Sequence, residues 1–184
     1  MILGDQDLKN YIQSGRLKIS NMTPDSIREN GVDCRIADSF ALDMLRLDKY
    51  PRDYVVDSHN LESSNKRFET MKFGTYNSVI IPSQINILLS TEEEFTFPDD
   101  LMAFCGLRST VARMGFISPI TIVDAGFHGT LTIEAFWGGK NPIKIYKGDR
   151  FLHVIFARLN TPCSKPYNGT YTGQSEVKLP KIMS

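Results

Sequence analysis

The chain has 184 residues, and 41% of them are hydrophobic, which is enough for one domain with a buried core. Lysine plus arginine and aspartate plus glutamate both number 21, so the formal net charge is zero. Proteins that bind long nucleic acids usually carry a basic surplus. The balance therefore argues against a nucleic-acid partner and favours a small anionic ligand in a local basic pocket.

The cysteines and the N-terminus bear on the compartment. Cys34, Cys105 and Cys163 are odd in number and show no paired spacing, which is typical of reduced thiols in a cytoplasm. Asp5 and Asp7 interrupt the N-terminus, so it does not read as a signal peptide. No segment approaches the roughly 20 apolar residues of a membrane helix. We therefore expect a cytoplasmic protein without a membrane partner.

In chain order, the first predicted element is a short amphipathic helix over residues 5–14. Leu8, Tyr11 and Ile12 share one face of it, and Gly15 can end it in a left-handed cap. Short apolar runs bounded by proline and glycine follow, and many strands at this spacing indicate an all-β sandwich or barrel. The predicted strands are 17–19, 31–36, 39–43, 78–81, 85–89, 101–104, 120–123, 130–136, 143–145 and 151–158.

Two segments are polar and lack clear periodicity. Residues 44–72 are rich in Asp, Lys, Arg, Asn and Ser, which predicts a surface excursion without a functional site. Residues 165–184 are polar and contain two glycines and prolines, which by composition alone predicts a mobile tail.

The run Gly106-Leu-Arg-Ser-Thr-Val-Ala-Arg-Met-Gly115 has the residues needed to hold phosphate. Arg108 and Arg113 offer several fixed N–H donors and stay charged at any working pH. Ser109 is a candidate N-cap for a short helical turn whose backbone N–H groups would face an anion. By itself, such a run is also typical of a solvated helix start.

Two isolated carboxylates follow this run. Glu134 lies in a strand pattern that puts Leu131 and Ile133 on one face and Glu134 beside Phe136 on the other. Partial desolvation there would suit the glutamate for proton transfer, whereas the pattern alone is more typical of a solvated strand residue. Asp124 precedes a turn, where an aspartate often bonds its own backbone.

The motifs occur in one order, which resembles the dCTP deaminase branch of the dCTP deaminase/dUTPase superfamily. The likeness runs from the N-terminus to the C-terminus, and only about residues 43–75 lack an obvious counterpart. It implies one nucleotide-hydrolase domain over 1–184: a distorted β-barrel or jelly-roll of the dUTPase-like type, with a short N-terminal helix, an insertion at 43–75 and a C-terminal arm at 165–184. The motifs are Met1-Ile-Leu-Gly-Asp-Gln-Asp7, Glu29-Asn-Gly-Val-Asp33, the run 106–115, Ile122-Val-Asp-Ala-Gly-Phe-His-Gly129, Thr132-Ile-Glu134 and Pro166-Tyr-Asn-Gly-Thr-Tyr-Thr-Gly-Gln174.

The resemblance also implies roles for single residues. Glu134 would be the general acid/base, taking a proton from water that attacks C4 of cytosine and delivering protons to N3 and the departing ammonia. Asp124 would accept a hydrogen bond from the deoxyribose 3′-hydroxyl, and the arm would close over bound nucleotide. The other substrate-binding residues implied are Arg108, Ser109, Thr110, Val111, Ala112, Arg113, Thr132, Ile133, Tyr167, Tyr171 and Gln174.

The chain departs from the family pattern at several points. Thr110 replaces a more usual serine and keeps the hydroxyl, whereas Thr170 stands where a lysine commonly precedes the tyrosine. The segment before Asp124 is about two residues shorter than in many relatives and lacks their Thr-Ala step, which bears on how cytosine is told from uracil. Asp33 could be structural or functional, and Arg150 is left outside the predicted site.

Zinc chemistry of the usual deaminase kind is not expected. Zinc deaminases hold their metal with His-x-Glu and Pro-Cys-x-x-Cys motifs. Here Cys163 lacks a second cysteine, and His59, His128 and His153 stand alone in the sequence. Protein groups would then activate the water, without a metal site, and Mg²⁺ is expected only as a companion of the triphosphate.

These inferences favour a hydrolase that converts dCTP to dUTP and ammonia, in the route to dUMP and dTTP. The alternatives are a dUTPase, which would release pyrophosphate from dUTP, or an enzyme with both activities. Thr172-Gly-Gln174 stands in place of the Gly-Phe-Gly type motif usual in trimeric dUTPases. A non-catalytic nucleotide-binding module is a third hypothesis, disfavoured by Arg108 and Glu134. The resemblance further implies a homotrimer with active sites shared between subunits.

Overall fold

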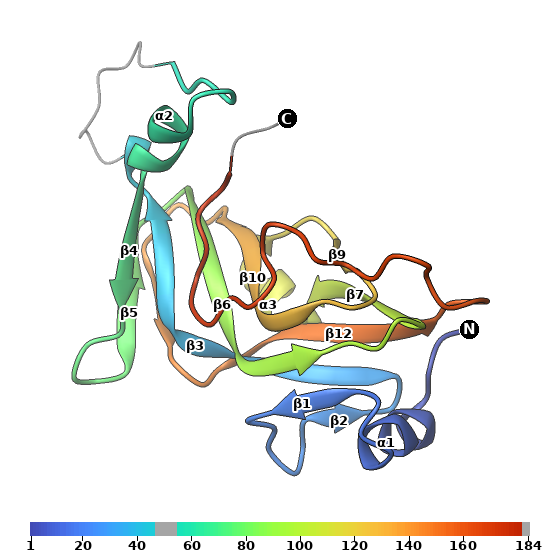
Figure 1. Ribbon diagram of the computed structural model, residues 1–184. Helices are drawn as coiled ribbons and strands as arrows, with labels where there is room; N and C mark the ends of the chain where they lie inside the picture. Colours follow the sequence, from blue (N-terminus) through green and yellow to red (C-terminus); the bar gives the residue numbers. More distant parts are fainter. Residues whose placement is uncertain (47–54, 182–184) are drawn as a thin grey trace.

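The computed structural model describes residues 1–46 and 55–181. These residues form a mostly antiparallel β structure, a sheet curled into a half-barrel with short helices at its margins (Figure 1). The predicted all-β class and the N-terminal helix are confirmed. None of the helices described is long and apolar enough to cross a membrane.

The strands alternate with tight turns, and most are longer than the sequence predicted. The helices are α1 (Asp5–Gln13), η1 (Met44–Arg46), α2 (Leu61–Lys66) and α3 (Ser109–Met114). The strands are β1 (Lys18–Ser20), β2 (Ile27–Arg28), β3 (Gly31–Asp43), β4 (Phe68–Lys72), β5 (Ser78–Ile81), β6 (Ile85–Thr96), β7 (Leu101–Leu107), β8 (Phe116–Ile117), β9 (Thr121–Val123), β10 (His128–Trp137), β11 (Ile143–Tyr146) and β12 (Arg150–Arg158).

Strand β3 joins the two halves of the curled sheet. Among the described residues, ten strands form one sheet with the central order β8-β10-β6-β3-β12-β7-β9, and β5 pairs with β11 separately. The first part of β3 pairs with β12, and its second part pairs with β6 and β4 after a register shift between Ile36 and Phe40. The sequence predicted two strands here, 31–36 and 39–43, but the structure has one continuous strand that changes partners at that irregularity.

The core lies inside the curl and is rich in phenylalanine. Phe97 stacks on Phe156 with ring centroids 5.4 Å apart, and Phe95 lies 5.8 Å from Phe97. Aromatic pairs of this kind contribute about 0.5–1.5 kcal/mol beyond the area that they bury. They tie β6, the turn after it and β12 together, and this holds the two sheet halves at a fixed distance.

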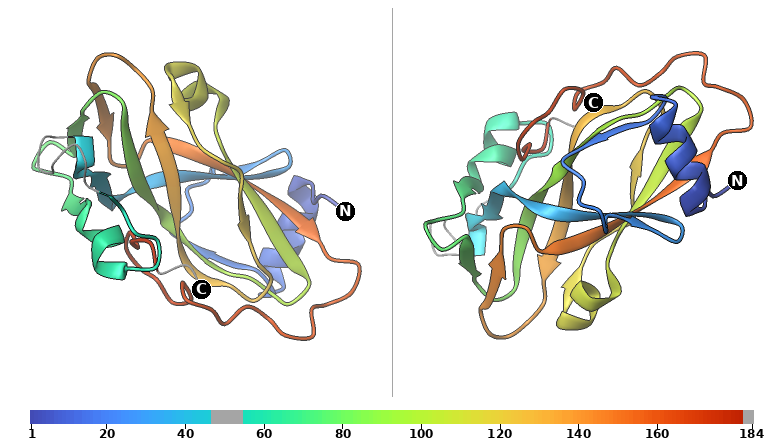
Figure 2. Two further views of the ribbon diagram at one scale, coloured as in Figure 1. Left: turned by 90° about the horizontal axis from the view of Figure 1, so that it is seen from above. Right: turned by 90° about the horizontal axis from the view of Figure 1, so that it is seen from below.

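The helix α1 covers the open side of the curl near β1 and β2 (Figure 2). Leu8 projects from α1 into the core and is fully buried, and Tyr11 and Ile12 of the same helix pack against that core. Gly15 follows with φ +73°, in the left-handed region, as predicted. Its backbone N–H donates to the Ile12 carbonyl oxygen, 3.0 Å away, which closes the last turn.

Part of the expected 43–75 excursion belongs to the sheet. Strand β4 pairs with β3, so that Phe40 lies opposite Met71 and Asp43 opposite Phe68. Arg67 forms an ion pair with the buried Asp43, 2.5 Å between Nη2 and Oδ2. The helix α2 stands away from the body, as Figure 1 shows, and residues 47–54 of the predicted excursion lie outside the described residues.

Candidate active site

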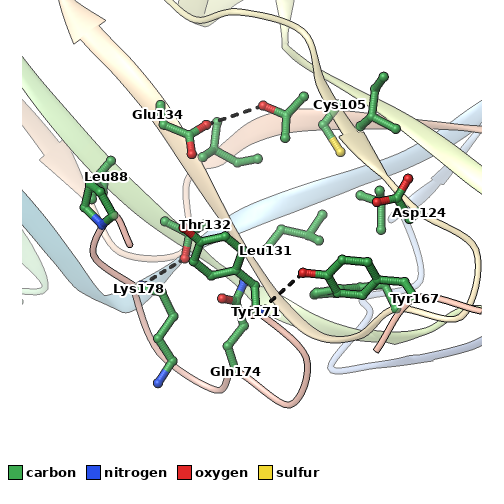
Figure 3. Close-up of a pocket in the computed structure, with 16 residues that line it drawn as sticks. Leu88, Cys105, Asp124, Leu131, Thr132, Glu134, Tyr167, Tyr171, Gln174 and Lys178 are labelled. Carbon is green, nitrogen blue, oxygen red and sulfur yellow. Dashed lines mark hydrogen bonds between the residues drawn. The ribbon is translucent and has the colours of Figure 1, made fainter. Parts of the chain in front are cut away.

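A cavity of about 350 Å³ is lined by seven of the predicted site residues, among others. It lies between the β6–β10 face, the β7–β9 edge and the C-terminal arm, and Figure 3 shows Glu134 and Asp124 on opposite sides of it. The predicted residues that line it are Asp124, Thr132, Ile133, Glu134, Tyr167, Tyr171 and Gln174.

Glu134 projects into this cavity from β10. The strand alternates as predicted: Leu131, Ile133 and Ala135 are buried in the core, and Glu134 faces the other way. The Thr121 hydroxyl donates to Glu134 Oε2 over 3.4 Å. In the single chain the glutamate is solvent-exposed, so the expected desolvation beside Phe136 is not seen.

Asp124 follows β9 at the mouth of the cavity. Its carbonyl oxygen accepts from the Phe127 N–H, 3.2 Å away, which closes the turn. Its carboxylate makes no hydrogen bond to any described residue and lines the cavity. The Asp124 side chain therefore does not bond its own backbone, which was the alternative interpretation of this turn. Both of its carboxylate oxygens can accept hydrogen bonds from a ligand.

The C-terminal arm, described as far as residue 181, covers the cavity. Its backbone runs beside β10, where the Thr130 N–H donates to the Gln174 carbonyl oxygen and the Gly173 N–H donates to the His128 carbonyl oxygen, each over 2.8 Å. The Gln174 side chain donates through Nε2 to the Thr130 carbonyl oxygen, 2.5 Å away. These bonds hold Gln174 in place with only 5% of its surface exposed.

Two tyrosines of the arm form one wall of the cavity. The Tyr171 N–H donates to the Tyr167 hydroxyl over 3.2 Å, drawn as a dashed line in Figure 3. Tyr167 packs on Phe127, with ring centroids 6.1 Å apart. Together with Asp124, Thr132 and Glu134, the two tyrosines line a cavity that combines aromatic and polar groups, as small-molecule sites do.

Beyond Gln174 the arm is fastened to the outer face of the sheet. The Val177 N–H donates to the Ser39 hydroxyl over 2.9 Å, and the Lys178 N–H donates to the Thr132 hydroxyl over 3.1 Å. Val177 is buried against Ala41 and Leu88. The described arm is thus packed rather than free, contrary to what its composition predicted.

The residues of the phosphate motif do not line this cavity. Arg108, Thr110 and Val111 line a second cavity of about 410 Å³, whereas Ser109, Ala112 and Arg113 are exposed on α3. The helix is predicted correctly, but the N-cap is Arg108 rather than Ser109, and no side chain caps it. Arg108 has an extended backbone conformation, and the helix begins at the next residue, Ser109.

Strands β6 and β10 separate the two cavities. Glu134 and its cross-strand partner Leu88 line the first, whereas Ala135 and Leu89 line the second. Successive strand residues point to opposite faces of a sheet. The general-base candidate and the arginine candidate therefore face different spaces within one chain.

Sequence reasoning missed several residues of the first cavity. Cys105 and Thr121 are cross-strand partners on β7 and β9, and both face it. Lys178 and Pro180 reach it from the arm. The strand predicted over 101–104 stops before Cys105, and nothing in its apolar pattern indicates a cavity there.

The thiols should differ in reactivity. Burial, with the nearby Glu134 carboxylate, raises the pKa of Cys105 to about 12, and burial raises the pKa of Cys34 well above its usual value. Cys163 is only half-buried. Because the thiolate is the reactive form, we expect a thiol reagent at pH 8 to label one cysteine per native chain and all three after denaturation. Rapid labelling of Cys105 in the native protein would contradict this reading.

Comparisons with known proteins identify the family to which the chain belongs. Residues 2–159 match the family model described as dCTP deaminase-like. The chain belongs to the dCTP deaminase-like family. It is 44% identical over 181 residues to a dCTP deaminase of Korarchaeum cryptofilum, a match that covers 98% of each chain.

Two further comparisons concern function and fold. A protein of Sulfolobus islandicus rod-shaped virus 1, named "Probable deoxyuridine 5'-triphosphate nucleotidohydrolase", is 42% identical, with 98% of this chain and 99% of that protein covered. The crystal structure of 2'-deoxycytidine 5'-triphosphate deaminase from Agrobacterium tumefaciens superposes with a TM-score of 0.63 at 15% identity, over 86% of this chain and 46% of that one. The latter confirms the predicted fold of the dUTPase-like type.

Proposed function

We propose that the chain is a dCTP deaminase that converts dCTP and water to dUTP and ammonia, a reaction that supplies dUMP and dTTP synthesis. The observation that carries the proposal is a carboxylate, Glu134, on the wall of a cavity with a second free carboxylate, Asp124, and two tyrosines, in a chain of this family. General acid–base catalysis needs such a group within reach of the reacting atoms.

Glu134 would act on a water molecule beside C4 of the cytosine ring. The carboxylate accepts a proton as the water oxygen bonds to C4, and it then protonates N3. The carboxylate next takes the proton of the C4 hydroxyl and delivers it to the 4-amino group, so that the C4–N4 bond breaks, ammonia leaves and the C4 carbonyl forms. The Thr121 hydroxyl, 3.4 Å from Oε2, supports this role because it restricts the rotation of the carboxylate.

The remaining groups would bind the nucleotide. Asp124 would accept a hydrogen bond from the sugar 3′-hydroxyl, and the Tyr171 and Gln174 side of the arm would cover the base. Arg108 and Arg113 would hold the phosphates with Ser109 and Thr110. The substrate would enter with Mg²⁺ on its phosphate oxygens.

The separation of the two cavities supports a site that is shared between subunits of a homotrimer. Arg108 cannot reach a nucleotide on the Glu134 side of β10 in its own chain, since the sheet lies between them. Exposed apolar side chains flank α3 and β9, a concentration that marks protein contacts. They are Phe104, Met114, Ile117, Ile120 and Ile122.

Mixing two inactive variants tests the shared site. In a Glu134→Gln chain the arginine is intact, and in an Arg108→Ala chain the glutamate is intact. If neighbouring subunits share each pocket, unfolding and refolding them together at equal amounts should restore about a quarter of wild-type activity, because one pocket in four pairs two intact halves. Mixtures no more active than either variant alone would exclude sharing.

A dUTPase, or an enzyme with both activities, is the second candidate. It is favoured by the viral relative named for dUTP hydrolysis and by the shortened segment before Asp124. Incubating the purified protein with dCTP or dUTP, with ammonia and pyrophosphate assayed separately, decides among them. Ammonia without pyrophosphate supports the deaminase, and pyrophosphate from dUTP without ammonia from dCTP would overturn it.

A further inference from the structure

A buried carboxylate that has no part in the proposed function is surrounded by cationic side chains. Asp33 is only 3% exposed, and its Oδ2 lies 3.1 Å from Arg108 Nε, 3.8 Å from Arg150 Nη1 and 3.9 Å from Arg28 Nε. Its Oδ1 lies 2.9 Å from His153 Nδ1. Oδ2 makes no aligned hydrogen bond, so its attraction to the three guanidinium groups is ionic.

The sheet brings these residues together from distant parts of the sequence. Asp33 on β3 lies opposite His153 on β12, and His153 lies opposite Gly106 on β7. Because β12 lies between the other two strands, the first residue after β7, Arg108, comes beside Asp33. The arrangement is therefore fixed by strand register rather than by a surface loop.

The cluster carries more positive charge than it needs to neutralise Asp33. Three arginines face one carboxylate, which leaves two unbalanced positive charges before His153 is counted. Asp149 also lines the second cavity and offsets one of them, and Arg150 Nη1 donates to the Asp25 carbonyl oxygen over 3.4 Å. The arginine side chains remain about one third exposed, so the excess charge is accessible to an anion.

Arg108 is held from one side only. Its Nε faces Asp33, and its terminal amino groups make no hydrogen bond to any described residue. A guanidinium is planar, so fixing the Nε edge also fixes the direction of the other donors. A buried carboxylate that is paired costs far less than one left alone, so the fold keeps the Asp33–Arg108 contact in place.

We propose that Asp33 is a positioning residue that orients Arg108 toward the nucleotide triphosphate, with Arg28 and Arg150 adding charge to the same anion site. The inference rests on the proposed function for the identity of the anion. It adds that the phosphate site is organised by a buried aspartate, and that the site includes the arginine of the Lys147–Arg150 turn.

Replacing Asp33 by asparagine keeps the shape and removes the charge. We expect about tenfold weaker binding of inorganic triphosphate by calorimetry, with deoxycytidine binding changed less than twofold, because the nucleoside lacks phosphates. Asp43→Asn is the matched control: Asp43 is an equally buried aspartate that pairs with Arg67 and lines neither cavity. It should lower the melting temperature and leave triphosphate binding unchanged.

A second pair of variants covers the case in which the Asp33 variant does not fold. Lysine has a single ammonium group, which cannot contact Asp33 and a phosphate with separate fixed donors. Arg108→Lys should therefore lose about tenfold in triphosphate affinity. Arg67→Lys is the control, since Arg67 pairs with the buried Asp43 and lines neither cavity, and this variant should keep wild-type triphosphate affinity. Equal losses in the two lysine variants would overturn the positioning role.

The outcomes separate this inference from the deaminase assignment. Wild-type triphosphate affinity in Asp33→Asn, or no triphosphate binding by the wild-type protein, would overturn the inference. A protein whose triphosphate affinity depends on Asp33, but which releases no ammonia from dCTP, would instead overturn the proposed function and leave the inference standing.

Discussion

Replacing Glu134 by glutamine should abolish ammonia release from dCTP while nucleotide binding survives. Glutamine keeps the size of the side chain and its contact with the Thr121 hydroxyl but cannot accept the proton of the attacking water. General acid–base groups typically contribute about 10²–10⁴-fold to rate, and we expect a loss of kcat at the upper end of that range because one residue handles every proton. Steady-state ammonia assays and calorimetry with dCTP measure the two effects.

Glu94 offers a matched control for this substitution. It is also an exposed glutamate on a long strand, near the end of β6, and it lies outside the cavity. Glu94→Gln should leave both kcat and KM within twofold of wild type. Unchanged turnover in Glu134→Gln would remove Glu134 from its role and with it the mechanism above.

Replacing Gly129 by alanine should detach the arm from the cavity. Gly129 has φ +128°, and a Cβ there would lie 2.6 Å from the Gln174 carbonyl oxygen and 2.9 Å from the Gln174 nitrogen. Both atoms are backbone, so the arm itself must move. Losing the hydrogen bonds of Gly173 and Gln174 would misplace the arm, and misplacement by about 1 Å can cost about 100-fold in rate. We expect kcat/KM for dCTP to fall about 10- to 100-fold.

Gly15→Ala separates this effect from backbone strain. Gly15 also has a positive φ, +73°, but a Cβ there meets nothing within 4 Å. A left-handed alanine costs roughly 1–2 kcal/mol, so this variant should melt at a lower temperature with unaltered kcat/KM. Limited proteolysis should cut the arm of Gly129→Ala and spare that of Gly15→Ala. If both variants keep full activity, closure of the arm does not matter for the reaction.

The sequence predicted the strands well where alternation is strong and poorly where tertiary pairing decides. The alternation in β10 located Glu134 and its neighbours correctly. Strand β4 was missed because Phe68-Glu-Thr-Met-Lys72 lies at the edge of the sheet, with both faces partly solvated, and so lacks an apolar face. The break predicted in β3 lies at Ala37 and Asp38, where the continuous strand shifts register and changes partner strand rather than ending.

Part of the candidate site could also be predicted from the sequence, and part of it depends on tertiary pairing. The carboxylates and the tail residues could be predicted because each belongs to a short motif. The contact of Asp33 with Arg108 could not, since it depends on β12 lying between β3 and β7. Nor does the sequence indicate that Glu134 is exposed in the single chain. Apolar residues beside a glutamate can bury its carboxylate or can form a contact with another molecule, and the sequence pattern is the same in both cases.

The path of β3 across both halves of the sheet has a consequence for the way in which the protein opens. One half cannot separate from the other without breaking the ladder that a single thirteen-residue strand makes with both. Its amide protons should therefore exchange with solvent only when the whole molecule unfolds, whereas those of the arm exchange through smaller, local fluctuations. The enzyme can thus release and reclose its cover over a body that stays rigid.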